Sequence, residues 1–134
     1  MKKVAFAVIC FLLAVCLCAC GGNVKDVKTH EVESTLFSQD EIRSAIDVIE
    51  NEFRRDWKGC TLTEIYYAGD ETTAAYQAWA DRNNADEVIV LLSSFDVDSS
   101  GGDGSLNPNS TYDNWIWILV RSDGGQWKHV DNGY

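Results

Sequence analysis

The stretch DVDSSGGDGSLNPN, residues 96–109, holds oxygen-bearing side chains at the spacing of a calcium-binding loop. In a calcium loop of about twelve residues, oxygen ligands stand at positions 1, 3 and 5, and a turn glycine stands at position 6. Four residues match these positions: Asp96, Asp98, Ser100 and Gly101. Asp103 adds a carboxylate, but Asn107 stands where a bidentate glutamate would close the loop. Any calcium site here is therefore expected to be weak.

The composition of this stretch also fits a long turn between two strands. Asp, Asn, Ser, Gly and Pro108 are residues that favour turns. Loops of this length are uncommon unless they are functional or mobile. We rank a connecting turn first, an interaction loop second and a weak calcium site third, and we expect no other cofactor.

Catalytic constellations are sparse. Cys60 and His129 could form a thiol and base pair, but the sequence places no orienting acid beside them. A lone cysteine at the start of a strand is more often a buried small apolar residue. Zinc needs several ligands at close spacing, and two histidines about a hundred residues apart with one thiol do not supply them. We therefore expect this protein not to be an enzyme.

Aromatic residues are numerous for a short chain. Most would fill the core between a sheet and its helices. The alternative is that some of them line a ligand pocket at the open end of a curved sheet. The candidate pocket residues are Tyr66, Trp79, Trp115, Trp117 and Tyr134.

The element that should organise this core is a long helix from Ser38 to about Gly59. Ser38 and Glu41 have the spacing of a capping box, and Phe37 precedes the cap as a hydrophobic staple would require. Apolar residues then recur at spacings of three and four: Ile42, Ala45, Ile46, Ile49, Phe53 and Trp57. This stripe predicts an amphipathic helix packed on a broad apolar surface.

Four strands and a second helix complete the expected elements. The strands lie near 60–69, 87–95, 114–121 and 126–130, and the second helix is predicted over 70–82 with Asp70 as its cap. The run NWIWILV is apolar on both strand faces, as is VIVLL. A strand of this kind needs cover on both sides. Because we expect both helices on one face, the other face is either capped by the long loop and the tether or is a candidate interface for a protein partner or a homodimer.

The start of the chain has the order of an export signal. Lys2 and Lys3 precede an apolar run over residues 4–17, which falls short of the roughly 20 residues that span a bilayer. The sequence Leu17-Cys18-Ala19-Cys20 resembles the lipobox of bacterial lipoproteins, with a small residue before the acylated cysteine. The resemblance implies lipidation of Cys20 and attachment to the extracytoplasmic face of the cell membrane.

Three segments follow from this assignment: a signal peptide at 1–19, the lipidated Cys20 with a flexible tether to residue 37, and a single domain at 38–134. The signal peptide removes two lysines and no acidic residue, which leaves 9 basic and 21 acidic residues. This acidity argues against nucleic acid as a partner, because such binding needs a basic surface. Of five cysteines only Cys60 is left as a thiol, so the mature chain has no internal disulfide.

The order helix, strand, helix and three-stranded meander resembles the NTF2-like and cystatin-like α+β folds, with helices on a curved antiparallel sheet of about four strands. The stretches GCTLTEIYY and DEVIVLLSSF resemble a group of uncharacterised bacterial lipoproteins, which implies a compartment but no activity. We expect a membrane-anchored binding or interaction module. The alternatives are a pocket protein of NTF2-like type for a small apolar ligand and a weak calcium-binding surface loop.

Overall fold

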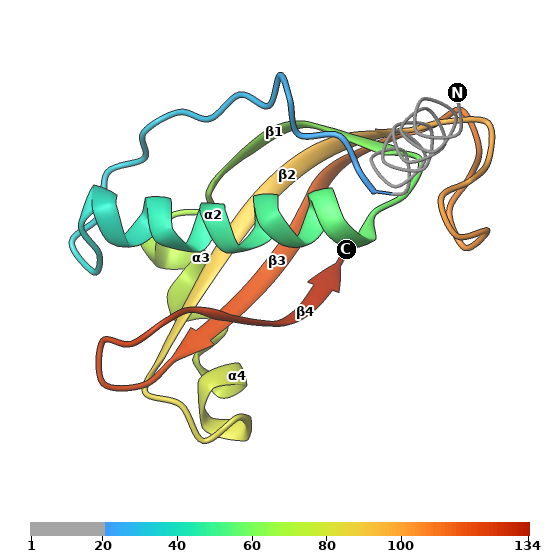
Figure 1. The fold of residues 1–134 in the computed structure, drawn as a ribbon. Coiled ribbons are helices and arrows are strands. Elements are labelled where there is room, and N and C mark those ends of the chain that lie inside the picture. Colours follow the sequence, from blue (N-terminus) through green and yellow to red (C-terminus); the bar gives the residue numbers. More distant parts are fainter. Residues whose placement is uncertain (1–20) are drawn as a thin grey trace, which may run out of the picture.

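The computed structural model describes residues 21–134, and its most prominent element is the helix α2, Gln39–Asp56 (Figure 1). The predicted capping box is confirmed: Ser38 Oγ accepts from the Glu41 N–H at 3.1 Å, and Glu41 Oε1 accepts from the Ser38 N–H at 3.0 Å. The expected stripe is buried from Ile42 to Phe53, and Phe37 is buried beside it. The start of α2 and its apolar face therefore follow directly from the sequence.

Four antiparallel strands form one sheet in the order β1-β2-β3-β4, as expected for the α+β class. Their bounds are β1 Cys60–Tyr67, β2 Glu87–Val97, β3 Thr111–Arg121 and β4 Lys128–Gly133. The last strand begins later than predicted and ends later. Trp127 precedes it and is buried against the core, with its indole N–H donated to the Glu41 carbonyl oxygen at 3.2 Å.

One face of the sheet packs on α2 and forms the main core. Along β3 this face carries Trp115, Trp117 and Leu119, alternating with Ile116, Ile118 and Val120 on the other face. The alternation is the one that a strand period of two requires. Phe53 and Trp57 of the helix end meet Trp117 from the sheet, at ring-centre distances of 6.4 and 5.1 Å.

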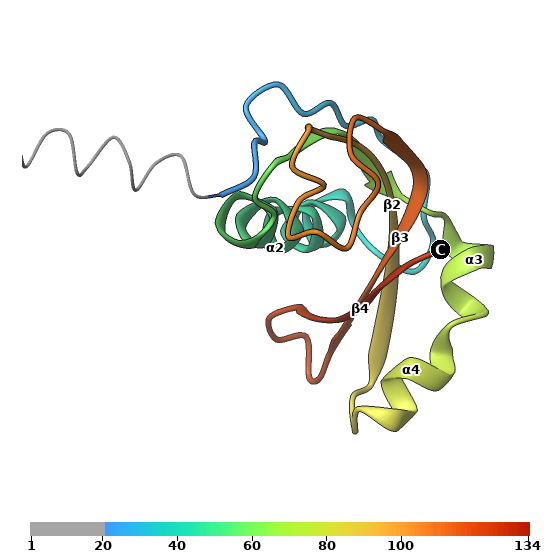
Figure 2. The same cartoon turned by 90° about the vertical axis from the view of Figure 1, so that its right-hand side faces the viewer.

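Two short helices, α3 Asp70–Ala74 and α4 Gln77–Arg82, lie on the opposite face of the sheet from α2 (Figure 2). A small second core forms there around Ala80, Val88, Ile118 and Val120, with Trp79 packed against it. Our expectation of both helices on one face was wrong. The two-sided apolar strands are covered within the chain over part of their length, so they no longer argue by themselves for a homodimer.

The predicted single helix over 70–82 is interrupted, and Asp70 does not cap it. Gly69 is the residue before α3, with a φ of 102°, and it offers no side-chain cap. The Asp70 carboxylate instead accepts hydrogen bonds from Ser34 Oγ at 2.6 Å, the Thr35 N–H at 2.7 Å and Tyr67 Oη at 2.8 Å. These bonds lower the pKa of Asp70 to about 2, with the Ser34 hydroxyl as the largest cause.

The partners of Asp70 reveal a second difference from expectation, because residues 21–37 are not a free tether. They run beside β1, with isolated bridges between Asn23 and Thr61 and between Lys28 and Glu64. The Asn23 N–H is donated to the Cys60 carbonyl at 2.9 Å and the Leu62 N–H to the Asn23 carbonyl at 2.8 Å. Polarity alone predicts a tether here, but the backbone of this segment forms hydrogen bonds with the open edge of β1.

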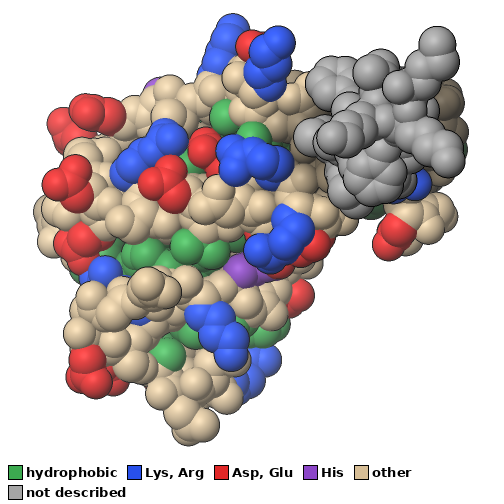
Figure 3. Space-filling view, in the orientation of Figure 1, with side chains coloured by type: hydrophobic (Ala, Val, Ile, Leu, Met, Phe, Trp, Pro, Cys, Tyr) green, Lys and Arg blue, Asp and Glu red, His purple; other side chains and the backbone are tan. Residues whose placement is uncertain are grey.

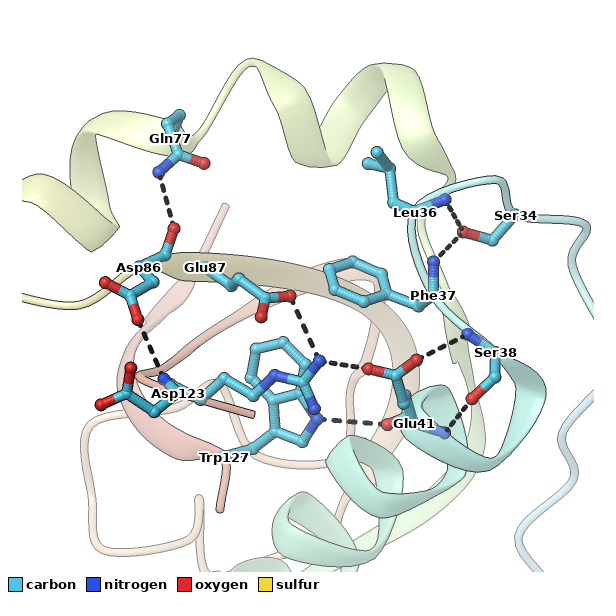
Figure 4. A network of polar contacts seen from close by, with 11 residues as sticks. Ser34, Leu36, Phe37, Ser38, Glu41, Gln77, Asp86, Glu87, Asp123 and Trp127 are labelled. Carbon is cyan, nitrogen blue, oxygen red and sulfur yellow. Dashed lines mark hydrogen bonds and ion pairs between the residues drawn. The ribbon is translucent and has the colours of Figure 1, made fainter. Parts of the chain in front are cut away.

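A polar network joins the start of α2 to the far end of β3 (Figure 4). The Arg121 side chain is only 8% exposed; it pairs with Glu41 and, at 3.2 Å, with Glu87. Its guanidinium carbon also lies 4.2 Å from the ring centre of Trp127. These contacts tie the helix to the sheet at the end opposite the long loop.

Candidate functional site

The long connection between β2 and β3 is a folded loop, residues 98–110. The Asp98 N–H is donated to the Gly59 carbonyl at 2.9 Å, and the Asn109 N–H to the Asp98 carbonyl at 2.9 Å. The Leu106 N–H reaches the Gly101 carbonyl at 3.2 Å, and its side chain packs against the main core. The loop thus turns back over the C-terminal end of α2 and the start of β1.

A pocket of about 370 Å³ lies beneath this loop. Its lining comes from the turn after α2, the loop, and the sheet: Asp56, Trp57, Lys58, Cys60, Gly102, Asp103, Ser105, Leu106, Trp115 and Asn132. Four separate segments of the chain therefore converge on one cavity. Apolar and aromatic walls with a few polar groups are typical of small-molecule sites.

The aromatic wall is preorganised by the core behind it. Trp57 is stacked on Phe53 with ring centres 5.2 Å apart and a 7° interplanar angle, and it meets Trp115 edge to face at 6.1 Å. The Trp115 indole N–H is donated to Asn132 Oδ1 at 3.2 Å. Both indoles are thus fixed by contacts that do not depend on a ligand.

Cys60 contributes a thiol to the pocket wall, but this thiol is a poor nucleophile. Its residue is 3% exposed, and burial is the largest cause that raises its pKa to about 11, followed by Asp98 and Asp103. At neutral pH such a group is almost entirely the unreactive thiol. His129 is engaged elsewhere, with Nδ1 2.5 Å from Glu52 Oε2 and Nε2 3.0 Å from the Asp131 carbonyl oxygen. The contacts of His129 do not form the thiol and base pair that the sequence allowed.

The structure separates the five predicted pocket residues. Trp115 lines the pocket. Tyr134 is 76% exposed, and its ring centre lies 5.2 Å from that of Trp115. Trp117 is fully buried in the core, with its indole N–H donated to Ser93 Oγ at 2.7 Å. Trp79 belongs to the second core, and the ring of Tyr66 lies 4.4 Å from that of His30.

Sequence reasoning missed several residues that complete the pocket. Trp57 belongs to the predicted helix stripe, but in the structure it follows the last helical residue and is half-buried. Cys60, Leu106 and Asn132 carry no motif, and only the fold brings them together. A tryptophan just past a helix end, facing a long loop, is the one signal that could have been used.

The predicted calcium ligands are engaged in local hydrogen bonds, Asp98 and Asp103 within their own turns and Asp96 across the β2–β3 pair. Asp98 Oδ1 accepts from the Ser100 N–H at 2.8 Å and from the Ser100 hydroxyl, and Asp103 Oδ1 accepts from the Ser105 N–H at 2.9 Å. Asp96 Oδ1 accepts from Thr111 Oγ1 at 2.7 Å. Across residues 21–134 no group of three or more His, Cys, Asp or Glu side chains could hold a metal ion. The structure therefore does not gather Asp96, Asp98, Ser100 and Asp103 into a cation site.

A second cavity, a more open groove of about 720 Å³, lies between the first half of α2 and the β3–β4 connection. Figure 3 shows hydrophobic side chains between α2 and the part of the sheet below it. The strongest polar groups of this groove, Arg121 and Glu41, are bound to each other. The pocket beneath the loop is the better candidate site, because it is the less open of the two and the indoles of Trp57 and Trp115 line it.

Comparison with protein-family models, curated protein sequences and solved structures finds no match for this chain. Within residues 21–134, none of the helices has the length and apolar character to cross a bilayer. Residues 1–20, with the predicted signal and the lipidation site Cys20, lie outside the described part of the chain.

Proposed function

We propose that this protein is a lipid-anchored, extracytoplasmic binding module without catalytic activity, whose ligand site is the pocket beneath the loop. The anchoring part of the proposal is supported by the lipobox-like sequence that ends at Cys20. The binding part is supported by one observation above all: two fixed indoles, Trp57 and Trp115, form a wall of an open pocket that a folded loop covers.

The ligand expected here is small and mostly apolar, with a flat or aromatic part. The volume of about 370 Å³ lies in the range of ligand cavities, toward its lower end. Indole faces and edges favour aromatic partners in stacked or perpendicular arrangements. Lys58 and Asp103 offer one cation and one anion at the wall, enough to orient a ligand that has a polar substituent, whereas the Asn132 amide is already bound to Trp115 and His129.

A noncatalytic role is supported by the chemistry of the wall. The pKa of Cys60 is raised to about 11, so the one thiol near the pocket is unsuited to attack a bound ligand. The strong excess of acidic residues in the mature chain makes nucleic acid an unsuitable partner.

The NTF2-like or cystatin-like identity of the domain is part of the proposal. It is supported by the order of elements, one long helix followed by antiparallel strands that pair sequentially. It is also supported by the position of α2 on one face of the sheet, with the pocket at one end of that helix.

A neutral fluorescent probe tests the pocket. N-phenyl-1-naphthylamine should bind residues 21–134, which contain every described element, with one site per chain and with quenching of tryptophan emission. Ser105→Trp places a large side chain at the pocket wall and should abolish the saturable signal. Ser44→Trp, which fills the groove beside α2, is the matched control and should leave it unchanged. Equal binding by both variants would overturn the assignment of the site.

A further inference from the structure

The chain enters the folded domain immediately after Cys20. The Gly22 N–H is donated at 3.2 Å to the Phe53 carbonyl oxygen, which also accepts the Trp57 N–H at the end of α2. The next residue, Asn23, exchanges backbone hydrogen bonds with Cys60 and Leu62 of β1. The segment is therefore held against both the helix end and the sheet edge from its first residues.

The glycine pair makes this close approach possible. A Cβ on Gly21 would overlap the Arg54 carbonyl oxygen, and one on Gly22 would lie 2.8 Å from both Phe53 Cδ1 and the Trp57 carbonyl oxygen. Cβ atoms are essentially never found so close to backbone. Gly21, the first residue that the structure describes, therefore lies directly against the end of α2.

Four basic residues lie at the same place. Segments 21–25 and 54–58 hold four of the nine basic residues outside the signal peptide, Lys25, Arg54, Arg55 and Lys58, and one acidic residue, Asp56. The folded loop adds two carboxylates on the Lys58 side of this end, Asp98 and Asp103. The rest of the mature chain has five basic and twenty acidic residues. Lys25 and Arg54 line one surface hollow with Gly21 and Gly22, and all four basic side chains are exposed. Figure 3 shows basic side chains over the C-terminal part of α2.

We infer that the end of the domain formed by residues 21–25 and 54–58 docks on the anionic headgroups of the bilayer that carries the anchor. This inference rests on the proposed acylation of Cys20. An anchor one residue from a fixed helix end leaves little freedom to hold the domain away from the surface. Cationic side chains near an anionic leaflet are attracted to it, whereas the acidic remainder of the domain is repelled.

Docking in this orientation brings the pocket close to the membrane. Asp56, Trp57 and Lys58 line the pocket and directly follow Arg54 and Arg55. In this orientation the protein would bind its ligand at the depth of the lipid headgroups.

Lysine footprinting on the full acylated protein tests the orientation. The protein is reconstituted in phosphatidylcholine vesicles with or without about 30% phosphatidylglycerol, labelled at trace level with an acetylating ester, and digested for mass spectrometry. Lys25 and Lys58 should be acetylated about fivefold more slowly on the anionic vesicles. Lys128, at the start of β4, should react at the same rate on both, and about 0.5 M NaCl should remove the protection because salt screens surface charge.

Two variants with the same loss of charge complete the test. Arg54→Gln/Arg55→Gln should reduce the protection of Lys58, whereas Arg43→Gln/Arg82→Gln, which removes two cations elsewhere, should not. Equal rates on both vesicles, or equal protection of Lys128, would overturn the inference while the same digest still showed an acylated Cys20. An unacylated Cys20 would instead overturn the proposed anchoring, and the orientation with it.

Discussion

The buried hydrogen bond between Trp117 and Ser93 gives the sharpest prediction about stability. The indole N–H is donated to Ser93 Oγ at 2.7 Å, and the two residues are 0% and 1% exposed. Ser93→Ala removes the acceptor and leaves the indole N–H buried without a partner. Such a group costs about 1–3 kcal/mol, beyond the small change in side-chain volume. We expect the free energy of unfolding to fall by about 2 kcal/mol.

Urea denaturation followed by far-ultraviolet circular dichroism measures this loss. With a denaturant slope of about 1–3 kcal/mol/M, a loss of about 2 kcal/mol lowers the midpoint by roughly 1 M. Ser94→Ala is the control, because Ser94 is half-buried and its effect should stay within about 0.5 kcal/mol.

A double-mutant cycle separates the hydrogen bond from packing. Trp117→Phe removes the N–H together with part of the ring, so Ser93→Ala in that background no longer strands a donor. The double variant should be more stable than the sum of the single losses predicts, by about 1–2 kcal/mol. Two results together would refute the assignment of Trp117 to the sealed core: losses of unfolding free energy that simply add in the double variant, and a loss for Ser93→Ala no larger than that for Ser94→Ala.

Three further predictions concern individual groups. Asp70 has its pKa lowered to about 2 in the folded state, so its contribution to stability is complete above about pH 4 and is lost as the pH falls toward 2. Asp70→Asn should flatten the dependence of the urea midpoint on pH within that window, and an unchanged profile would contradict the bonds to Ser34 and Thr35. Cys60, with a pKa of about 11, should resist iodoacetamide at pH 8 in the folded protein and react once urea unfolds it; rapid native labelling would show that the loop does not shield the thiol. Gly22→Val should detach the N-terminal segment from α2 and increase hydrogen exchange at the amides of Asn23 and Leu62; exchange equal to that of the wild type would mean that this close approach is not needed.

The elements that carry local signals were predictable from the sequence. The capping box at Ser38 and Glu41 places the start of α2, and the alternation along β3 places each side chain on its face. Both patterns arise from interactions within a few residues in the chain. The sheet order also follows, because sequential antiparallel pairing is the simplest connection of three neighbouring strands.

The pocket was only partly predictable, because its residues meet through tertiary contacts. Aromatic content alone could not separate Trp117, which is sealed between sheet and helix, from Trp115, which reaches the cavity two residues earlier on the same strand face. The difference arises from position along the strand. Trp115 lies nearer the loop end and lines the pocket, whereas Trp117 lies two residues farther along and packs against both Phe53 and Trp57.

The N-terminal segment was misjudged for a related reason. Its polar sequence has no strand period, yet its backbone pairs with β1 at Asn23 and Lys28, and its Ser34 hydroxyl binds Asp70. Backbone hydrogen bonds to a sheet edge need no particular side chains, so the sequence carries no sign of them.

Mass spectrometry of the mature protein, purified from the membranes of its host, tests the central claim most directly. The account predicts an N-terminal peptide that begins at Cys20 and carries a diacylglyceryl group on its sulfur, with Gly21 and Gly22 directly after it. An unacylated mature protein, or one whose first residue lies elsewhere, would contradict the account.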